Sequence, residues 1–462
     1  MGRLFLISNI FGILYLAICL LHQSFKSKKW SSEKDPSGTI TAFTFSPVSL
    51  FETSVIFCFC KEAYTQSIKE SVKTALDNNE SLKSQKVLLD NSYQNLLIQK
   101  GTMLPSLSLS GTGTRSSNFD SNQDSDSYSI SLNSSYTLFD FGSLKAKKRS
   151  SFHLNEASIL SFKKLEDELI LSVVKVHLEL FKAIKIVDLY ESSLEIRKQQ
   201  YVAVKNRFDL GEATRTDLLR SKASISRAEA QLKVGQANVK KLRESYKTLV
   251  GKVSDKPMLP KMKIKEPSTL EISVRGGIEN DIALKILTFE ERALRAELSS
   301  IEKSQLPNLS LSGSLSYGDS QTLGNNISSG RISLSSSLIL YSGGQKKARV
   351  KIASNKLAAK AIDIAVRKKT LQRDITTKWL DLVALKSSVI AKQEETNALN
   401  ELYESVFEEW RLGGKTSLDT DQAYQNFLNS EVELVTSTTD ILIAKFDLLA
   451  EIGTLRTKLQ LR

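Results

Sequence analysis

The chain has 462 residues, of which 41% are hydrophobic, and this content excludes a wholly disordered protein. Its formal net charge of +13 could indicate binding to nucleic acid or to an anionic surface. Basic residues are interleaved with acidic ones along the predicted helices, however, as in residues 163–168. This mixture is typical of a solvated helical face rather than of a nucleic-acid-binding stripe.

Two apolar stretches lie in the first 60 residues. Arg3 is followed by an apolar run over residues 4–21, which resembles a signal sequence or a membrane anchor, and a second run covers residues 48–60. Residues 16–19 partly match a lipoprotein signal, but isoleucine before Cys19 fits that signal poorly. We assign residues 1–60 as an export signal and an otherwise unassigned extension. The cleavage site, the true start and lipidation stay open.

Helical periodicity begins near Tyr64 and runs to about Lys100, after which the hydrophobic period changes to two. This alternation predicts a strand hairpin over residues 104–140 with a polar loop at 118–127. Its apolar positions are Leu107, Leu109, Tyr128, Ile130, Leu132, Tyr136 and Leu138. A second predicted hairpin covers residues 306–341 with a loop at 318–330. Its apolar positions are Leu309, Leu311, Leu315, Tyr317, Ile332, Leu334, Leu338 and Leu340.

Each predicted strand has about ten residues, which is the length that a tilted strand needs to cross a membrane. The alternate positions are mostly Ser, Thr, Asn and Gly, which suits a wet lumen. The alternative is a soluble hairpin packed on a core, but thin helices cannot cover its apolar face. Open sheet edges are not tolerated in lipid, so four strands per chain cannot stand alone. Three chains sharing one barrel would give 12 strands.

Each hairpin is followed by a stretch of 68 residues that contains neither glycine nor proline, at 143–210 and at 345–412. Because proline breaks helices and glycine weakens them, each stretch can form one continuous helix of roughly 100 Å. A glycine then precedes a threonine and an aspartate, as in Gly211, Thr214 and Asp217. This order predicts a helix end, a tight turn and the start of an antiparallel helix.

The whole pattern occurs twice at a constant offset of 202 residues. The matching pairs are Pro105 and Pro307, Gly142 and Gly344, Tyr201 and Tyr403, Gly211 and Gly413, Thr214 and Thr416, Asp217 and Asp419, and Gly251 and Gly453. We therefore predict tandem repeats at 61–253 and 269–455, joined by a proline-containing linker at 254–268. Residues 456–462 form a C-terminal tail.

This order of strands, long helix, glycine turn and helix resembles the TolC family of outer-membrane efflux and secretion proteins. The most specific stretches are 201–219 and 403–424, and Leu-Pro at 104–105 and 306–307 matches the strand entries of the family. The resemblance covers roughly residues 62–455. It implies a mixed α/β membrane protein: a homotrimer with a shared 12-stranded antiparallel β-barrel, four strands per protomer, continuous with a periplasmic α-helical coiled-coil barrel.

The resemblance also implies a periplasmic end that is closed at rest by links between neighbouring coiled coils. By position, the aromatic residue of these links is Trp410, the basic residue is Lys415 and the acidic partner is Asp217. Trp and Lys replace the Tyr and Arg of the family, and a Lys–Asp pair lacks bidentate geometry, so weaker closure is expected. The alternative role for these residues is turn capping, since carboxylates are favoured at helix starts.

Acidic rings line the tunnel constriction in the family, and Asp419 matches the first acidic position. The second position falls on Gln422, while the neighbouring Asp421 is expected to face elsewhere. A ring of Asp419 carboxylates would favour cations. The hairpin turns at Gly211, Thr214, Gly413 and Thr416 match the docking region for a periplasmic adaptor.

No catalytic chemistry is indicated. All three cysteines precede Lys61, His153 and His177 lie alone, and no nucleotide-binding, nucleophile-elbow or HExxH motif appears. We expect no enzyme activity and no cofactor or metal. The predicted function is a passive outer-membrane exit duct for an efflux or type I secretion system. Its partners are an adaptor (membrane fusion) protein, an inner-membrane ABC or proton-driven exporter, and outer-membrane lipid. The alternatives are a non-channel coiled-coil scaffold and, less favoured, a basic nucleic-acid-binding rod.

Overall fold

The computed structural model describes residues 65–118, 123–251, 256–257, 267–320 and 325–459. The predicted export region at 1–60 and most of the predicted linker lie outside the described residues. Within the described ranges, no helix combines the length and the apolar character needed to cross a membrane.

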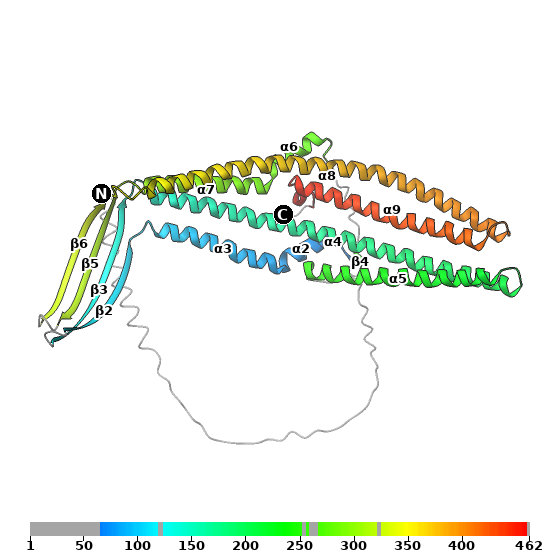
Figure 1. Ribbon diagram of the computed structural model, residues 1–462, viewed down its shortest axis with the longest axis horizontal. Helices are drawn as coiled ribbons and strands as arrows, with labels where there is room; N and C mark the ends of the chain where they lie inside the picture. Colours follow the sequence, from blue (N-terminus) through cyan, green and yellow to red (C-terminus); the bar gives the residue numbers. More distant parts are fainter. Residues whose placement is uncertain (1–64, 119–122, 252–255, 258–266, 321–324, 460–462) are drawn as a thin grey trace, which may run out of the picture. The chain divides into compact units, whose positions relative to one another are not determined.

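The described elements follow one order twice (Figure 1). The first half contains α2 (Ile68–Asn78), α3 (Glu80–Gly101), β2 (Ser106–Asn118), β3 (Gln123–Phe139), α4 (Ser143–Asp209) and α5 (Arg215–Val250). The second half contains α6 (Leu270–Asn280), α7 (Ile282–Lys303), β5 (Asn308–Ser320), β6 (Asn325–Ser337), α8 (Gln345–Arg411) and α9 (Ser417–Glu451). Two short strands, β1 (Thr65–Gln66) and β4 (Lys256–Pro257), pair in parallel, and α10 (Leu455–Lys458) follows α9.

The two long helices begin and end close to the limits predicted from the sequence. Each of α4 and α8 has 67 residues, and each starts after a glycine with positive φ, Gly142 or Gly344. Both helices run from the sheet to a turn that leads into α5 or α9 (Figure 1). The absence of glycine and proline from these stretches therefore translates directly into continuous helix.

The helical periodicity between Tyr64 and Lys100 corresponds to two helices, α2 and α3, which meet at Asn79. Asn79 has extended backbone geometry, with ψ of 122°, and its side-chain oxygen accepts a hydrogen bond from the Leu82 amide. Asp281 separates α6 from α7 in the same way and accepts from the Ala283 amide. A short polar side chain can accept hydrogen bonds from the first amides of a new helix, so such a break costs little free energy of folding.

The four longer strands form one antiparallel sheet in the order β2-β3-β5-β6. The register places the alternating apolar residues on one face, where Leu109 opposes Leu132, Leu132 opposes Leu315, and Leu311 opposes Leu334. The opposite face carries almost only serine, threonine and asparagine. Many of the apolar side chains are exposed in the single chain, including Leu109, Ile130, Leu315 and Ile332.

The strands are longer than the ten residues predicted, because the polar segments assigned to loops also pair. Ser127, for example, lies opposite Thr114. Backbone groups form the ladder whatever the side chain, so a polar sequence does not end a strand. Conversely, β6 ends at Ser337, opposite the first residue of β5, so the predicted strand positions Leu338 and Leu340 lie beyond it.

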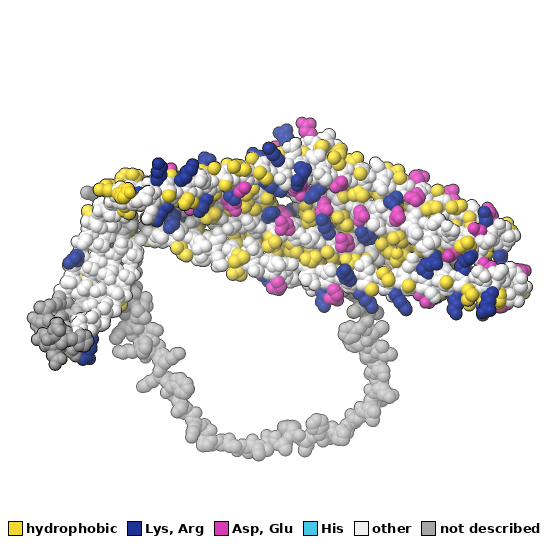
Figure 2. Space-filling view, in the orientation of Figure 1, with side chains coloured by type: hydrophobic (Ala, Val, Ile, Leu, Met, Phe, Trp, Pro, Cys, Tyr) yellow, Lys and Arg dark blue, Asp and Glu magenta, His cyan; other side chains and the backbone are white. Residues whose placement is uncertain are grey.

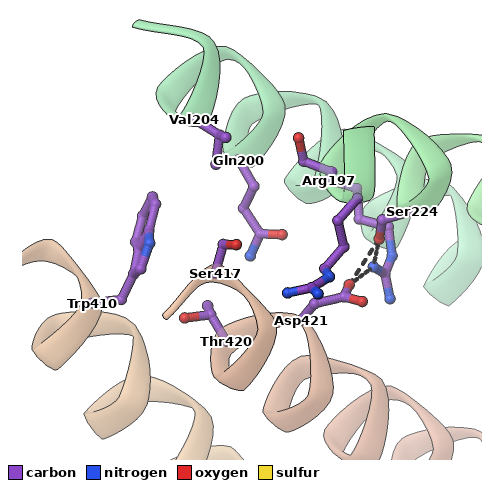
Figure 3. A pocket seen from close by; sticks show the side chains of 10 residues that line it. Arg197, Gln200, Val204, Ser224, Trp410, Ser417, Thr420 and Asp421 are labelled. Carbon is purple, nitrogen blue, oxygen red and sulfur yellow. Dashed lines mark hydrogen bonds and ion pairs between the residues drawn. The ribbon is translucent and has the colours of Figure 1, made fainter. Parts of the chain in front are cut away.

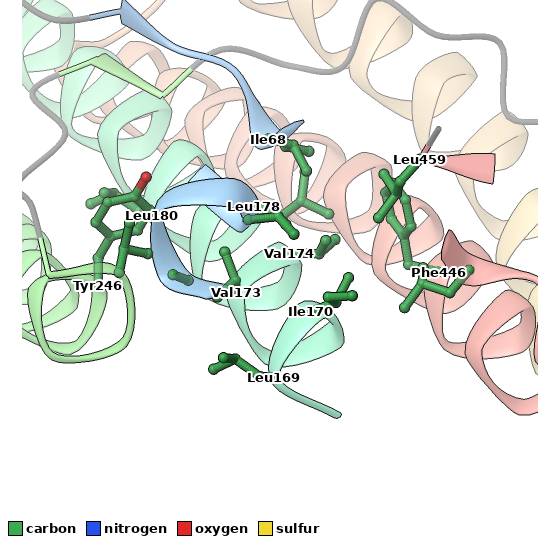
Figure 4. Close-up of a cluster of buried hydrophobic side chains, with 14 of the residues drawn as sticks. Ile68, Leu169, Ile170, Val173, Val174, Leu178, Leu180, Tyr246, Phe446 and Leu459 are labelled. Carbon is green, nitrogen blue, oxygen red and sulfur yellow. The ribbon is translucent and has the colours of Figure 1, made fainter. Parts of the chain in front are cut away.

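The main hydrophobic core lies midway along α4, where α2, α5, α9 and α10 pack against it (Figure 4). Ile170, Val174 and Leu178 of α4 are fully buried there beside Tyr246 of α5 and Phe446 of α9. A second cluster joins α8 to α9 through Leu371, Ile375 and Leu448. Neither of these two clusters of described residues includes a residue of the sheet. Figure 2 shows mixed charges along the helices and few hydrophobic side chains on the visible face of the sheet.

Candidate functional site

The turns between the long and short helices have the same geometry in both halves. Gly211 and Gly413 have φ of 81° and 84°, which favours glycine because a side chain would be strained there. The Glu212 amide donates to the Arg207 carbonyl at 2.8 Å, and the Gly414 amide donates to the Glu409 carbonyl at 2.8 Å. These bonds satisfy the last carbonyls of α4 and α8 and fix the direction of each turn.

The helix after each turn begins with reciprocal capping hydrogen bonds. The Asp217 amide donates to Thr214 Oγ1 at 3.2 Å, and the Thr214 amide donates to Asp217 Oδ2 at 3.2 Å. Thr416 and Asp419 form the same pair of bonds at the start of α9. The Thr416 side chain, then its backbone amide, lowers the pKa of Asp419 below its ordinary value. Both carboxylates therefore stay ionised at neutral pH, but both are also engaged as helix caps.

All three predicted gate residues make contacts within one chain. Asp217 accepts a hydrogen bond from Ser417 Oγ at 2.6 Å, and this bond, followed by that of Thr214, lowers the pKa of Asp217. Trp410 is only 7% exposed and lies beneath the Arg207 guanidinium, 4.5 Å from the ring centroid. Lys415 is more exposed, and its ammonium lies 3.9 Å from a Glu409 carboxylate oxygen.

Arg207 also joins the two hairpins by capping the end of α8. Its guanidinium donates to the Trp410 carbonyl at 3.2 Å and to the Arg411 carbonyl at 2.9 Å. A cation at the C-terminal end of a helix is stabilised by the exposed carbonyl groups and by the helix dipole. The α4–α5 turn is thereby tied to the α8–α9 turn at a second point besides Asp217.

A buried ionic cluster joins α4, α5 and α9 farther from the turns than these caps (Figure 3). Arg197 of α4 is 1% exposed and forms an ion pair with Asp421 of α9, which also accepts from Ser224 Oγ of α5 at 2.8 Å. The second guanidinium nitrogen of Arg197 donates to Gln425 at 2.8 Å, and its charge lies 5.2 Å from the Tyr424 ring centroid. Asp421 thus faces the interior of the chain, which confirms that it points elsewhere than Asp419.

The Arg197–Asp421 pair is the last member of a series along the contact between α4 and α9. Lys175 lies 2.7 Å from Asp447, and Lys182 lies 3.1 Å from Asp440. In every pair, α4 supplies the cation and α9 supplies the anion. We call these three ion pairs the α4–α9 charge series.

The structure thus brings most predicted turn residues together at one end of the helices, but sequence reasoning missed several of their neighbours. Arg197, Ser224 and Arg207 carried no motif, because their partners lie far away in the sequence. The exposed leucines of the turns were also missed. Leu210 is 75% exposed and Leu412 is 88% exposed, and each precedes the turn glycine. The sequence signal for these residues was present, since an apolar residue at a solvent-facing turn repeats at the same offset in both halves.

A sequence model of the family described as "Outer membrane efflux protein" matches residues 72–252 and 278–454. Outer membrane efflux protein BepC of Brucella suis is 25% identical over 291 residues, which span 62% of this chain and 64% of BepC. The chain therefore spans just under two thirds of that relative. Outer membrane protein TolC of Escherichia coli is 19% identical over 419 residues, with 86% of this chain and 84% of TolC covered.

Solved structures with the same fold include a membrane protein from Pseudomonas aeruginosa, with a TM-score of 0.75 at 19% identity, covering 84% of this chain and 90% of that chain. The CmeC outer membrane channel of Campylobacter jejuni has a TM-score of 0.73 at 18% identity, covering 91% of this chain and 94% of that chain. The two stretches matched by the family model account for more than half of the sequence, and so the chain belongs to the outer membrane efflux protein family, the family of TolC.

Proposed function

We propose that the chain is the outer-membrane exit duct of a tripartite efflux or type I secretion system. Three copies share a 12-stranded barrel, and their helices form a tunnel in the periplasm. The observation that carries this proposal is the sheet, which has one apolar face, one hydroxyl-rich face and two edges. Among the described strands, β2 pairs only with β3, and β6 pairs only with β5. Such edges need partners in lipid, and copies of the same chain can supply them.

The two halves of the chain support a quasi-symmetric duct. Each helix or strand of the first half begins 202 residues before its counterpart in the second half. This holds for all six pairs, from α2 with α6 to α5 with α9. We infer that they are tandem repeats, so that three chains contribute six similar units around one axis. Aromatic residues lie where the sheet meets α4, including Phe139 and Phe141 with ring centroids 4.8 Å apart. Such aromatic girdles are typical of membrane interfaces.

Membrane extraction and conductance test the duct directly. The purified full chain is expected to require detergent, to migrate as a heat-sensitive trimer and to conduct ions across planar bilayers. A scaffold protein would instead be soluble without detergent and would not conduct. Retention on DNA that is lost as salt increases would support the nucleic-acid-binding alternative.

Closure of the periplasmic end is assigned to Trp410, Lys415 and Asp217, acting between neighbouring copies. Within one chain Asp217 keeps one oxygen on Thr214 and the other on Ser417, whereas Lys415 forms, among the described residues, only a long ion pair of 3.9 Å with Glu409 and acts on Asp419 through its charge. Lys415 is therefore the gate residue most available to a neighbouring chain. The hydrogen bonds from Thr214 and Ser417 hold the Asp217 carboxylate in a fixed orientation, and a neighbouring chain could place a cation next to it.

The exposed leucines at the turns support docking of a periplasmic adaptor there, which would link the duct to an inner-membrane ABC or proton-driven exporter. Replacing Leu412 with aspartate is expected to reduce export at least about tenfold, since a charge in an apolar contact costs more than one tenfold step in affinity. Export and adaptor cross-linking in cells would be measured, with trimer content as the folding control. Val234, which is exposed on α5 away from the turns, provides the matched Val234→Asp variant. Equal loss from both variants would contradict docking at the turns.

Asp419 is proposed to form an anionic ring at the constriction. Asp419→Asn keeps an oxygen that can cap α9 but removes the charge, so it is expected to lower the preference for cations in single-channel recordings. Because the pKa of Asp419 lies below its ordinary value of 3.8, the preference should persist above that pH and disappear only as the pH falls through the lowered pKa. Glu229→Gln removes an exposed carboxylate from α5, outside the gate residues, and should leave selectivity intact. Unchanged ion selectivity in Asp419→Asn would contradict the proposed ring of Asp419 carboxylates.

A further inference from the structure

The hydroxyl-rich face of the sheet carries one charged side chain among the residues whose side chains are described. The register assigns to this face residues 106–116, 127–137, 308–318 and 329–337 at every second position. These positions hold Ser, Thr, Asn and one Gly, with Arg331 as the exception. No carboxylate occurs among these described positions.

Arg331 occupies the middle of β6, far from either end of the strand. It lies opposite Ser314, and the same row across the sheet continues through Asn133 to Ser108. A shallow pocket on this face is lined by the Arg331, Asn133, Ser314 and Ser333 side chains, among others. The side chain of Arg331 is exposed, and no described carboxylate lies within ion-pair distance of it.

The other described arginine of the sheet has a different environment. Arg115 belongs to the apolar face near the end of β2, and Asp126 lies directly opposite in the register with 3.8 Å between the charged groups. That charge is compensated by its neighbour and lies away from the middle of the strands. Of these two arginines, therefore, Arg331 alone places a guanidinium without a described counter-ion at the centre of a neutral polar face.

We propose that Arg331 forms a cationic ring in the lumen of the barrel and attracts anionic solutes that carry carboxylate, phosphate or sulfate groups. This inference rests on the proposed function, because the ring exists only where three copies close a barrel with the hydroxyl-rich face inward. A guanidinium binds oxyanions through two parallel hydrogen bonds, and the surrounding serine hydroxyls can donate further bonds. Rings of arginine or lysine favour anions in pores. The barrel would then attract anions, while the Asp419 ring at the other end attracts cations.

The test compares the full-length trimer with Arg331→Ala, Arg331→Lys and Arg331→Glu in planar bilayers under a KCl gradient. Arg331→Ala is expected to lower the chloride-to-potassium permeability ratio at least about twofold near 0.1 M salt, and the difference should vanish near 1 M, where the Debye length falls from about 10 to about 3 Å. Arg331→Lys should retain the ratio and Arg331→Glu should lower it further. Arg115→Ala, which removes the same charge from the opposite face, should leave it unchanged.

A chemical variant covers the case in which Arg331→Ala does not assemble. Arg331→Cys is treated in the open channel with a cationic and, separately, with an anionic methanethiosulfonate reagent, and wild type receives the same treatment. The cationic reagent should raise the chloride preference and the anionic reagent should lower it. An unchanged ratio in these variants, from channels that still conduct, would overturn the Arg331 ring alone. A wild-type trimer that does not conduct would overturn the proposed duct as well.

Discussion

Replacing Ile130 with arginine is expected to prevent the proposed trimer from inserting into the outer membrane. Ile130 is 57% exposed on the apolar face of β3 in the single chain. An arginine that faces lipid near the bilayer midplane costs roughly 2–4 kcal/mol, and the trimer would carry that cost in each of its three subunits. The measurement is the amount of heat-sensitive trimer in the outer-membrane fraction.

The adjacent residue provides the control for Ile130. Ser131 lies on the opposite face, where its hydroxyl is 3.0 Å from that of Ser316, so Ser131→Arg should still assemble. The two variants place the same arginine at neighbouring positions of β3, of which one is assigned to the lipid-facing side and the other to the lumen. Normal insertion of both variants would indicate a sheet that does not meet lipid. Insertion of Ile130→Arg alone would show that the two faces are assigned the wrong way round.

Replacing Arg197 with methionine is expected to loosen the end of the helical hairpins. Removing one partner of a buried ion pair typically costs about 3–5 kcal/mol, because the remaining charge keeps its burial but loses its counter-ion. Here the remaining group is Asp421, which is 19% exposed and would retain only Ser224 and the more distant Arg227. Native-state hydrogen exchange of α5 and α9 near the turns would report the change in local opening free energy.

Two further variants decide whether the effect of Arg197 is ionic. The double variant Arg197→Met with Asp421→Leu removes both charges and should recover most of the lost protection. Lys392→Met interrupts the Lys392–Glu433 pair between α8 and α9, where Glu433 is exposed, and should leave the protection close to that of wild type. Equal protection in Arg197→Met and wild type would show that the cluster does not hold the hairpins together.

The larger elements could be predicted from the sequence because their signals are local. Runs without glycine or proline predicted α4 and α8, and Gly211 and Gly413 marked the turns, since only glycine adopts their backbone geometry easily. Alternating leucine and serine predicted both the hairpins and the two faces of the sheet. The helix breaks could not be predicted in this way, because Asn79 sits in a sequence that is compatible with continuous helix, and the surrounding packing decides whether its cap forms.

The candidate site was predictable only where it depends on the turns. Thr214 with Asp217 and Thr416 with Asp419 were recognised as helix starts, and the structure confirms their capping bonds. The gate and constriction roles of these residues stay predictions. The Arg197–Asp421 pair joins residues 224 positions apart on helices of different halves. The sequence around Arg197 and around Asp421 does not indicate that either side chain is buried or that the two form an ion pair.

The α4–α9 charge series has no charged counterpart at the equivalent positions of α8 and α5, although matching elements of the two halves begin 202 residues apart. At the equivalent places α8 carries Thr377, Ala384 and Leu399, and α5 carries Ser245, Asn238 and Leu219, none of them charged. In a closed ring of three chains, the contact between α4 and α9 inside each chain would therefore contain these ion pairs. The contact between α8 of one chain and α5 of the next would lack them. In the proposed trimer, the subunits would separate at the contacts between chains, so that widening of the tunnel would leave the contacts inside each chain intact.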